Sequence, residues 1–182
     1  AARELFVHRG FVTTSMEAIA GRAKVAAPTV YAAFGSKRAI LTAIAEQLSA
    51  DTLRATGVAS PAEVAKLDVR EQVRVLARFR RLHGEIGGDI LQMVQGTALV
   101  DPDAAALVAK REAGRRERAR AFVVAWKRQG ALRPGLTVGK ATDVLWALGD
   151  AGLYRLFVMK SGWSGDRFER WIRETMEAQL LR

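Results

Sequence analysis

Residues 13–37 have the sequence TTSMEAIAGRAKVAAPTVYAAFGSK. Thr14 is followed three residues later by Glu17, a capping-box pattern that predicts the start of a short helix. Pro28 suits the first position of a second short helix, which should end before the glycine that follows it. The intervening turn is residues 24–26. The spacing therefore predicts two helices joined by a tight turn, as in a helix-turn-helix motif.

The residues around this pair predict a compact cluster of helices. Before it, apolar residues recur at helical spacing from Ala2 to Arg9, and Gly10 is a natural stop. After it, Ser36 can cap a fourth helix. The side chains expected to face the core are Ile19, Ala23, Val25, Val30 and Phe34. Those expected to face outward are Ala27, Pro28, Thr29, Ala32 and Ala33, with Tyr31 and Lys37 at the edge.

The rest of the chain also has the periodicity of helices, and no run alternates as a strand would. Capping boxes begin at Ser60 and Asp68, after a looser segment at residues 56–60 that is a candidate hinge. Glycines 84, 87 and 88 are expected to interrupt the pattern. The predicted helices beyond the hinge are 69–82, a short one at 90–98, a long one at 101–129, 138–160 and 165–181. We thus expect an all-α fold of about nine helices.

Composition restricts the possible functions. The chain has 182 residues, no cysteine and a formal net charge of +10. The charge favours a polyanionic partner, and the lack of cysteine excludes disulfides and thiolate chemistry and fits a cytoplasmic protein. The apolar run at 144–159 is interrupted by Asp150 and Arg155, so no membrane partner is expected. Residues 1–3 already have a mid-helix pattern, which indicates that the natural chain begins earlier.

An enzyme would need convergent acids, bases or metal ligands. The two histidines, His8 and His83, fall in different predicted domains, and no acidic pair or glycine-rich phosphate loop stands out. We therefore expect no catalytic residues, no metal and no cofactor. An architectural DNA-binding or protein-interaction module without a ligand is one function that these observations leave open.

The N-terminal residues resemble the TetR family of transcriptional regulators. The match covers about the first 45 residues and consists of Leu5-Phe6, Gly10-Phe11, Thr13-Thr14, Ile19-Ala20, Ala23, Val25, Thr29-Val30-Tyr31, Phe34, Ser36-Lys37 and Leu41. Near the C-terminus, residues 152–155, 162–164 and Trp171 resemble the same family more loosely. The resemblance implies a helix-turn-helix DNA-binding domain at 1–48 and a helical ligand-sensing and dimerisation domain at 49–182.

The resemblance also implies a set of DNA-binding residues. Thr14, Tyr31 and Lys37 would contact phosphates of double-stranded DNA. The full predicted set is Thr14, Ala27, Pro28, Thr29, Tyr31, Ala32 and Lys37. The sequence departs from the family pattern at Lys24, where glycine is usual, and at Ala32 and Ala33, where larger side chains are usual. Specificity would then depend on thymine methyl contacts, DNA shape and residues that precede this chain.

For the C-terminal domain, the resemblance implies a homodimer formed by the last two helices. The candidate interface is Leu145, Leu148, Gly149, Gly152, Leu156, Phe168, Trp171, Ile172, Met176 and Leu180. Alternatively, the stripe from Phe168 to Leu180 could pack on the core of its own chain.

A small-molecule effector is implied as well. The candidate pocket is Phe79, Leu82, Gln92, Met93, Phe122, Trp126, Trp146, Asp150 and Tyr154, although each of these could equally be plain core. The basic run from Lys110 to Arg120 predicts either a solvated helix face or a site for an anionic ligand. The predicted function is a ligand-responsive DNA-binding regulator, most often a repressor in this family.

Overall fold

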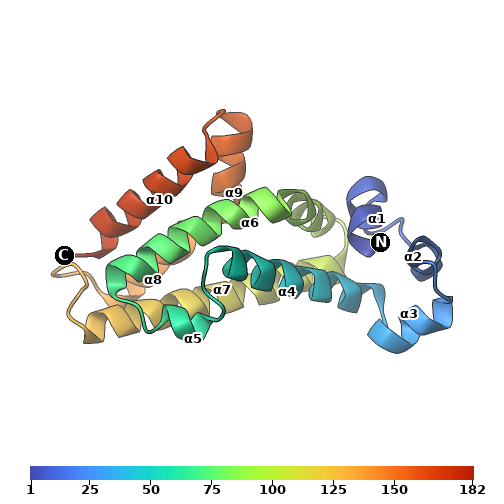
Figure 1. The fold of residues 1–182 in the computed structure, drawn as a ribbon, viewed down its shortest axis with the longest axis horizontal. Helices are drawn as coiled ribbons and strands as arrows, with labels where there is room; N and C mark the ends of the chain where they lie inside the picture. The colour runs from blue at the N-terminus through green and yellow to red at the C-terminus, as the bar shows by residue number, and fades with distance from the viewer. The chain divides into compact units, whose positions relative to one another are not determined.

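The chain folds entirely into helices and turns. This computed structural model describes the backbone of residues 1–182 and every side chain except that of Asp103. Within that description no β-strand forms, and β pairing is limited to a bridge between Leu132 and Leu181. The helices in Figure 1 are α1 (Ala2–Arg9), α2 (Met16–Ala23), α3 (Ala27–Phe34), α4 (Lys37–Ala55), α5 (Pro61–Val64), α6 (Val69–Thr97), α7 (Pro102–Arg128), α8 (Val138–Ala147), α9 (Ala151–Tyr154), the π-helical η1 (Arg155–Lys160) and α10 (Gly165–Leu180).

The chain divides into two compact units. The head unit consists of Ala1–Ser49 and Gly87–Arg111, and the C-terminal unit consists of Ala50–Ile86 and Glu112–Arg182. Three helices, α4, α6 and α7, contribute residues to both units.

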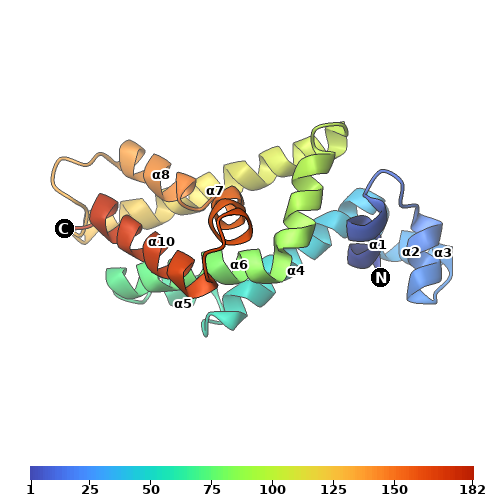
Figure 2. The same ribbon diagram turned by 90° about the horizontal axis from the view of Figure 1, so that it is seen from above.

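The head unit has its own apolar core. Phe6 and Leu41 have no exposed surface, and Ile19 and Val30 bring α2 and α3 onto the same cluster. The rings of Phe6 and Phe11 meet edge to face with centroids 5.2 Å apart, an arrangement that aromatic quadrupoles favour. Figures 1 and 2 both show α2 and α3 joined by a short turn, with α1 beside them. The core thus fixes the angle between the two helices of the pair.

Short polar side chains begin several helices, as predicted. Each accepts a hydrogen bond from the backbone N–H three residues further on and so satisfies a donor that the helix leaves free. The donor–acceptor distances are 3.1 Å at Ser36, 3.3 Å at Ser60, 3.0 Å at Asp68 and 2.8 Å at Asp101.

The predicted break after residue 82 is wrong, because α6 runs without interruption through its glycines. These glycines serve close packing. A Cβ at Gly84 would lie 2.3 Å from the ring of Tyr154, and one at Gly87 would lie 2.2 Å from the side chain of Leu48. The packing against neighbouring side chains offsets the low helix propensity of glycine.

The predicted single helix at 138–160 is also wrong. The chain leaves α8 after Ala147 and restarts at Ala151, where the side chain of Asp150 accepts a hydrogen bond of 2.7 Å from the amide of Gly152. The Asp150 carboxylate gives the backbone amide of Gly152 a partner outside the regular helix. Asp150 therefore separates the two helices and caps the second.

The C-terminal unit buries the apolar stripe of α10. Phe168, Ile172, Met176 and Leu180 are at most 1 % exposed, and they pack with Trp126 and Leu145 in one cluster. Aromatic contacts from Phe157 to Trp163 and Trp171, both with centroids 4.6 Å apart, hold η1 against this helix.

The assignment of that stripe to a dimer interface is therefore wrong for its buried members. A side chain that its own chain already covers offers no surface to a second copy. The members excluded in this way are Leu145, Gly149, Phe168, Ile172, Met176 and Leu180.

Candidate nucleic-acid interface

The turn between α2 and α3 contains a strained residue. Lys24 has φ 57° and ψ 40°. Among the described residues it is the one non-glycine with a positive φ. The left-handed conformation costs an L-residue roughly 1–2 kcal/mol. The glycine that is usual in the family at this position would avoid that cost. The amide of Lys24 closes α2 by donating to carbonyls of that helix.

The N-terminus of α2 differs from the prediction. Ser15, not Thr14, is the N-cap, and its hydroxyl accepts a hydrogen bond of 3.1 Å from the amide of Ala18. Thr14 is 2 % exposed, and its hydroxyl donates to the carbonyl of Gly10 at 2.7 Å. The Thr14 side chain thus anchors the loop between α1 and α2 and has no free hydroxyl for a phosphate.

Lys37 also has internal partners. Its ammonium group donates to the backbone carbonyls of Phe11, Val12 and Thr14 at 2.6, 3.1 and 2.8 Å. The same nitrogen lies 4.5 Å from the centroid of the Phe11 ring. An ammonium has three donors, and all of them are engaged. In this structure Lys37 ties α4 to the loop before α2 and has no donor left over for a phosphate.

The outward face of α3 is exposed, as the spacing predicted. Pro28, Thr29, Ala32 and Ala33 are exposed, and Ala27 is half-buried against the head core. The helix begins at Ala27, so Pro28 occupies its second position and not its first. The helix is 8 residues long, and its exposed face carries small side chains. These leave room for the helix to approach a DNA groove closely.

Three residues expected in the core are exposed instead. Ala23 is exposed, Val25 is 44 % exposed and Phe34 is 45 % exposed. The core already takes Met16, Ile19 and Ala20 from α2 and Val30 from α3, and α1 and α4 cover the rest of the cluster. Val25 and Phe34 could not be predicted as surface residues, because their spacing alone is that of core positions.

Tyr31 stands at the edge of the same face. Tyr31 is 46 % exposed, and its hydroxyl donates a hydrogen bond to Oε1 of Glu17 at 3.2 Å. This hydrogen bond raises the pKa of Tyr31, while hydrogen bonds from its own backbone amide and from Ser15 and Tyr31 lower the pKa of Glu17. The tyrosine is therefore a neutral donor held at the surface of the head.

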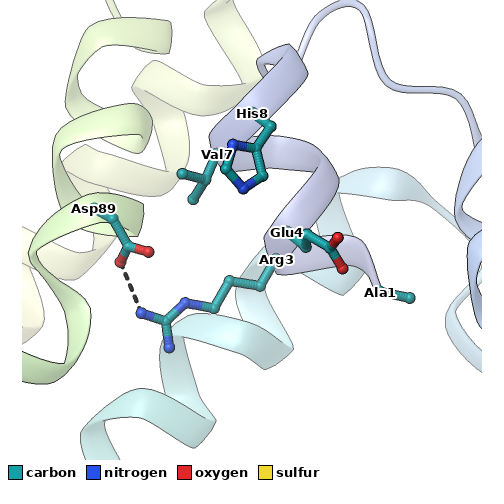
Figure 3. A pocket seen from close by; sticks show the side chains of 6 residues that line it. All are labelled: Ala1, Arg3, Glu4, Val7, His8 and Asp89. Atoms are coloured by element: carbon teal, nitrogen blue, oxygen red, sulfur yellow. Dashed lines mark hydrogen bonds and ion pairs between the residues drawn. The ribbon is translucent and has the colours of Figure 1, made fainter.

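Ion pairs hold α1 in place within the head unit. Arg22 reaches Glu4 at 2.6 Å, and Arg3 reaches Asp89 of α6 at 2.7 Å. Figure 3 shows the second pair at the side of an open hollow of about 400 Å³. Ala1, Arg3, Glu4, Val7, His8 and Asp89 line this hollow. None of them belongs to the predicted effector pocket.

The predicted pocket residues are divided between the two units. Gln92 and Met93 belong to the head unit, whereas the other seven belong to the C-terminal unit. Trp126 is fully buried, and its indole N–H donates to Oε1 of Gln72 at 2.7 Å. Tyr154 packs edge to face on Phe168. These two are core residues, and no sequence pattern predicted the buried glutamine that pairs with Trp126.

Among the described residues, no group of three or more His, Asp or Glu side chains is placed to hold a metal ion. No helix in this part of the chain is both long and apolar enough to cross a bilayer.

Comparison with known proteins agrees with this geometry. Residues 1–44 match the family model described as bacterial regulatory proteins, tetR family. No curated protein sequence matches the chain.

Solved structures share the fold over the whole chain. The TetR family transcriptional regulator PfmR from Thermus thermophilus is 20 % identical with a TM-score of 0.59, covering 100 % of this chain and 97 % of its own. A transcriptional regulator from Saccharomonospora viridis, solved with choline, is 19 % identical with a TM-score of 0.71, covering 100 % and 94 %. A fatty acid metabolism regulator from Clostridium perfringens is 17 % identical with a TM-score of 0.69, covering 100 % and 97 %.

A helix-turn-helix head on a separate helical unit defines a DNA-binding transcriptional regulator. Residues 1–44 match the TetR family of such regulators, and the whole chain shares its fold with solved structures of that family. Members of this family are not enzymes, which agrees with the absence of a catalytic constellation in the sequence.

Proposed function

We propose that this TetR-family regulator binds an operator in double-stranded DNA as a homodimer and is released from it by a small molecule, as a repressor. The observation that carries the DNA-binding part is the exposed face of α3, with Pro28, Thr29 and Ala32 on a helix whose angle the head core fixes. The division of labour follows the proposed domains 1–48 and 49–182. A regulator of this kind acts on chromosomal DNA and therefore in the cytoplasm.

The small side chains of α3 determine how DNA would be read. Methyl groups of Ala32 and Thr29 can contact thymine methyls in the major groove, but alanine cannot hydrogen-bond a base. Tyr31 supplies the phosphate donor, because exchanging Glu17 for a phosphate oxygen needs only a rotation of an exposed side chain. Thr14 and Lys37 support the loop that positions α2, and we assign them this indirect role in DNA binding.

The homodimer is needed for geometric reasons. Two heads must reach successive major grooves about 34 Å apart. Among the predicted interface residues, Leu156 remains 50 % exposed, and its neighbour on η1, Met159, is 61 % exposed. Leu148, Gly152 and Trp171 are half-buried. These outward residues, together with the exposed face of α10, are the proposed contact between two copies.

The effector would bind in the C-terminal unit and change the distance between the heads through α4. A hundredfold loss of operator affinity needs only about 2.7 kcal/mol of coupling. The structural relatives include one solved with choline and one named for fatty acid metabolism. These relatives support a small-molecule effector in general and do not specify the effector of this chain.

A fluorescence anisotropy titration with operator DNA found by genomic selection tests the function. Phosphate contacts release counterions, so the affinity should fall steeply between low and physiological salt. Analytical ultracentrifugation of the same sample should show a dimer. Affinity that does not change with salt, or a protein that stays monomeric on DNA, would contradict the proposal.

The alternative is an architectural DNA-binding module without an effector. The complete burial of Trp126, a predicted pocket residue, favours it. A screen for compounds that release bound DNA separates the two functions, because an architectural module should respond to none of them.

A further inference from the structure

Two arginines of the C-terminal unit converge on one glycine. Arg80 comes from α6, Arg115 from α7, and Gly149 lies in the connection between α8 and α9. A Cβ added at Gly149 would lie 2.9 Å from Nη2 of Arg80 and 2.9 Å from Nη1 of Arg115. The two guanidinium groups therefore lie close together on the same side of this backbone, where any larger residue would displace them.

Arg115 is satisfied by its surroundings. It forms an ion pair with Glu112, lies 3.5 Å from a carboxylate oxygen of Asp150, and donates to the carbonyl of Trp146. Its guanidinium carbon also lies 5.1 Å from the centroid of the Trp146 ring. With a side chain only 13 % exposed, Arg115 is a partly buried, paired cation.

Arg80 differs because its Nε is buried without a hydrogen-bond partner within the described chain. Its guanidinium lies 5.5 Å from the centroid of the Phe79 ring, and no carboxylate in that description forms an ion pair with it. Burial and the positive charges of Arg115 and Arg118 lower its pKa to about 10, so Arg80 still carries its charge at neutral pH. A buried cation without a partner is costly.

A second unsatisfied donor belongs to Trp146, whose ring and carbonyl contact Arg115. The indole N–H of Trp146 is buried and has no acceptor among the described residues. Buried polar groups are almost always paired, so two orphan donors in one cluster require an explanation. The acids nearby do not provide one, because Glu112 and one oxygen of Asp150 face Arg115 and the other oxygen of Asp150 caps α9.

The charges around the cluster leave an excess of one positive charge. The charged groups that act on Arg80 are Arg115 and Arg118, which lower its pKa, and the carboxylates of Glu112 and Asp150, which raise it. The surrounding side chains of Phe79 and Trp146 are aromatic. An anionic head with an apolar body would complement both features.

We infer that this cluster binds a small organic carboxylate, whose oxygens accept from Arg80 and from the indole N–H of Trp146. Arg115 borders the site and is held in place by Glu112 and Asp150. This inference rests on the proposed ligand-responsive function and specifies the chemical class of the effector. A quaternary ammonium such as the choline bound by the structural relative from Saccharomonospora viridis would be repelled here.

The test uses the full chain with sodium benzoate, phenylacetate and hexanoate, against choline chloride and sodium chloride at equal ionic strength. Calorimetry and thermal melting should show binding and a rise of several degrees in melting temperature with at least one carboxylate and with neither chloride salt. Arg80→Met should lower the affinity for that carboxylate at least tenfold. Arg78→Met is the matched control, since Arg78 is exposed on the same helix, and should bind as the wild type does.

The outcomes separate this inference from the proposed function. If none of the carboxylates binds, or if Arg80→Met binds them as tightly as the wild type, the anion site is wrong. If a neutral or cationic compound releases DNA and the carboxylates do not, the regulator function stands and the effector class is wrong. If the protein binds carboxylates but no DNA, the site stands and the proposed function fails.

Discussion

The head unit and the C-terminal unit each hold a partly buried cation, and the two cations differ in their hydrogen-bond partners. In the head, the ammonium of Lys37 has three carbonyl partners within 3.1 Å. In the C-terminal unit, Nε of Arg80 has none in the described chain, although the side chain lies among aromatic rings and other arginines.

This difference separates a structural cation from a candidate binding group. A satisfied buried charge holds its neighbours in one arrangement, and its removal leaves acceptors unpaired. An unsatisfied buried charge lowers stability and is relieved by a ligand that binds only the folded state. The basic residue of the head that was expected to bind DNA is therefore structural, and the arginine of the other unit is the better candidate for a ligand.

The largest expected effect is at Lys37. Lys37→Met keeps the aliphatic stem but leaves three carbonyls without a donor, so the free energy of unfolding should fall by about 3 kcal/mol. Urea unfolding followed by circular dichroism measures it, with Lys24→Met as a control at an exposed lysine. Full stability combined with a loss of DNA affinity would show instead that Lys37 contacts phosphate.

Arg80 should behave in the opposite way. Without ligand, Arg80→Met should raise the free energy of unfolding by about 1 kcal/mol, because it removes a buried unpaired charge. The folded-state pKa of about 10 lies below the ordinary value of an arginine, so the cost is fully present below pH 10 and is relieved only above it. The gain should therefore be equal in urea titrations at about pH 6 and about pH 9. A destabilised variant would show that Arg80 has a partner in the folded chain.

Tyr31 tests which residue of the head contacts phosphate. Tyr31→Phe should lower DNA affinity roughly fivefold to tenfold on operator and unrelated DNA alike, because phosphate contacts are independent of sequence. The stability should change by less than about 0.5 kcal/mol, since the side chain is exposed. Anisotropy on both DNAs measures the effect, and a loss confined to the operator would assign Tyr31 to base recognition.

The smallest effect is expected at Lys24. Lys24→Gly removes the left-handed strain but adds flexibility to the unfolded chain, so the net gain in stability should be about 0.5 kcal/mol. Lys24→Ala separates the backbone effect from the loss of charge, because alanine keeps the strain. If both variants melt at the same temperature, the conformation of residue 24 costs nothing measurable.

Local signals in the sequence were reliable where one residue acts on its own helix. The stops at Gly10 and Gly35, the caps at Ser36 and Asp68, and the strain at Lys24 all depend on backbone geometry within a few residues. They were predictable because capping and left-handed turns are set by the chain itself.

Long-range packing could not be predicted in the same way. The glycines of α6 look like helix breakers until Tyr154 and Leu48 lie against them. Likewise, the apolar spacing of Val25 and Phe34 is that of core residues, yet other helices already cover that core. Spacing shows that a helix has an apolar face and does not show what covers it.

The sequence alone thus determined the all-helical class, because helical periodicity runs along the whole chain. It also determined the helix-turn-helix and the family resemblance, because these depend on local patterns within residues 1–44. The tertiary structure decided that the stripe of α10 packs on its own chain, that Lys37 is bound internally and that Arg80 is left without a partner. Those outcomes depend on which distant groups meet, and the burial of a charge has a physical consequence only once its neighbours are in place.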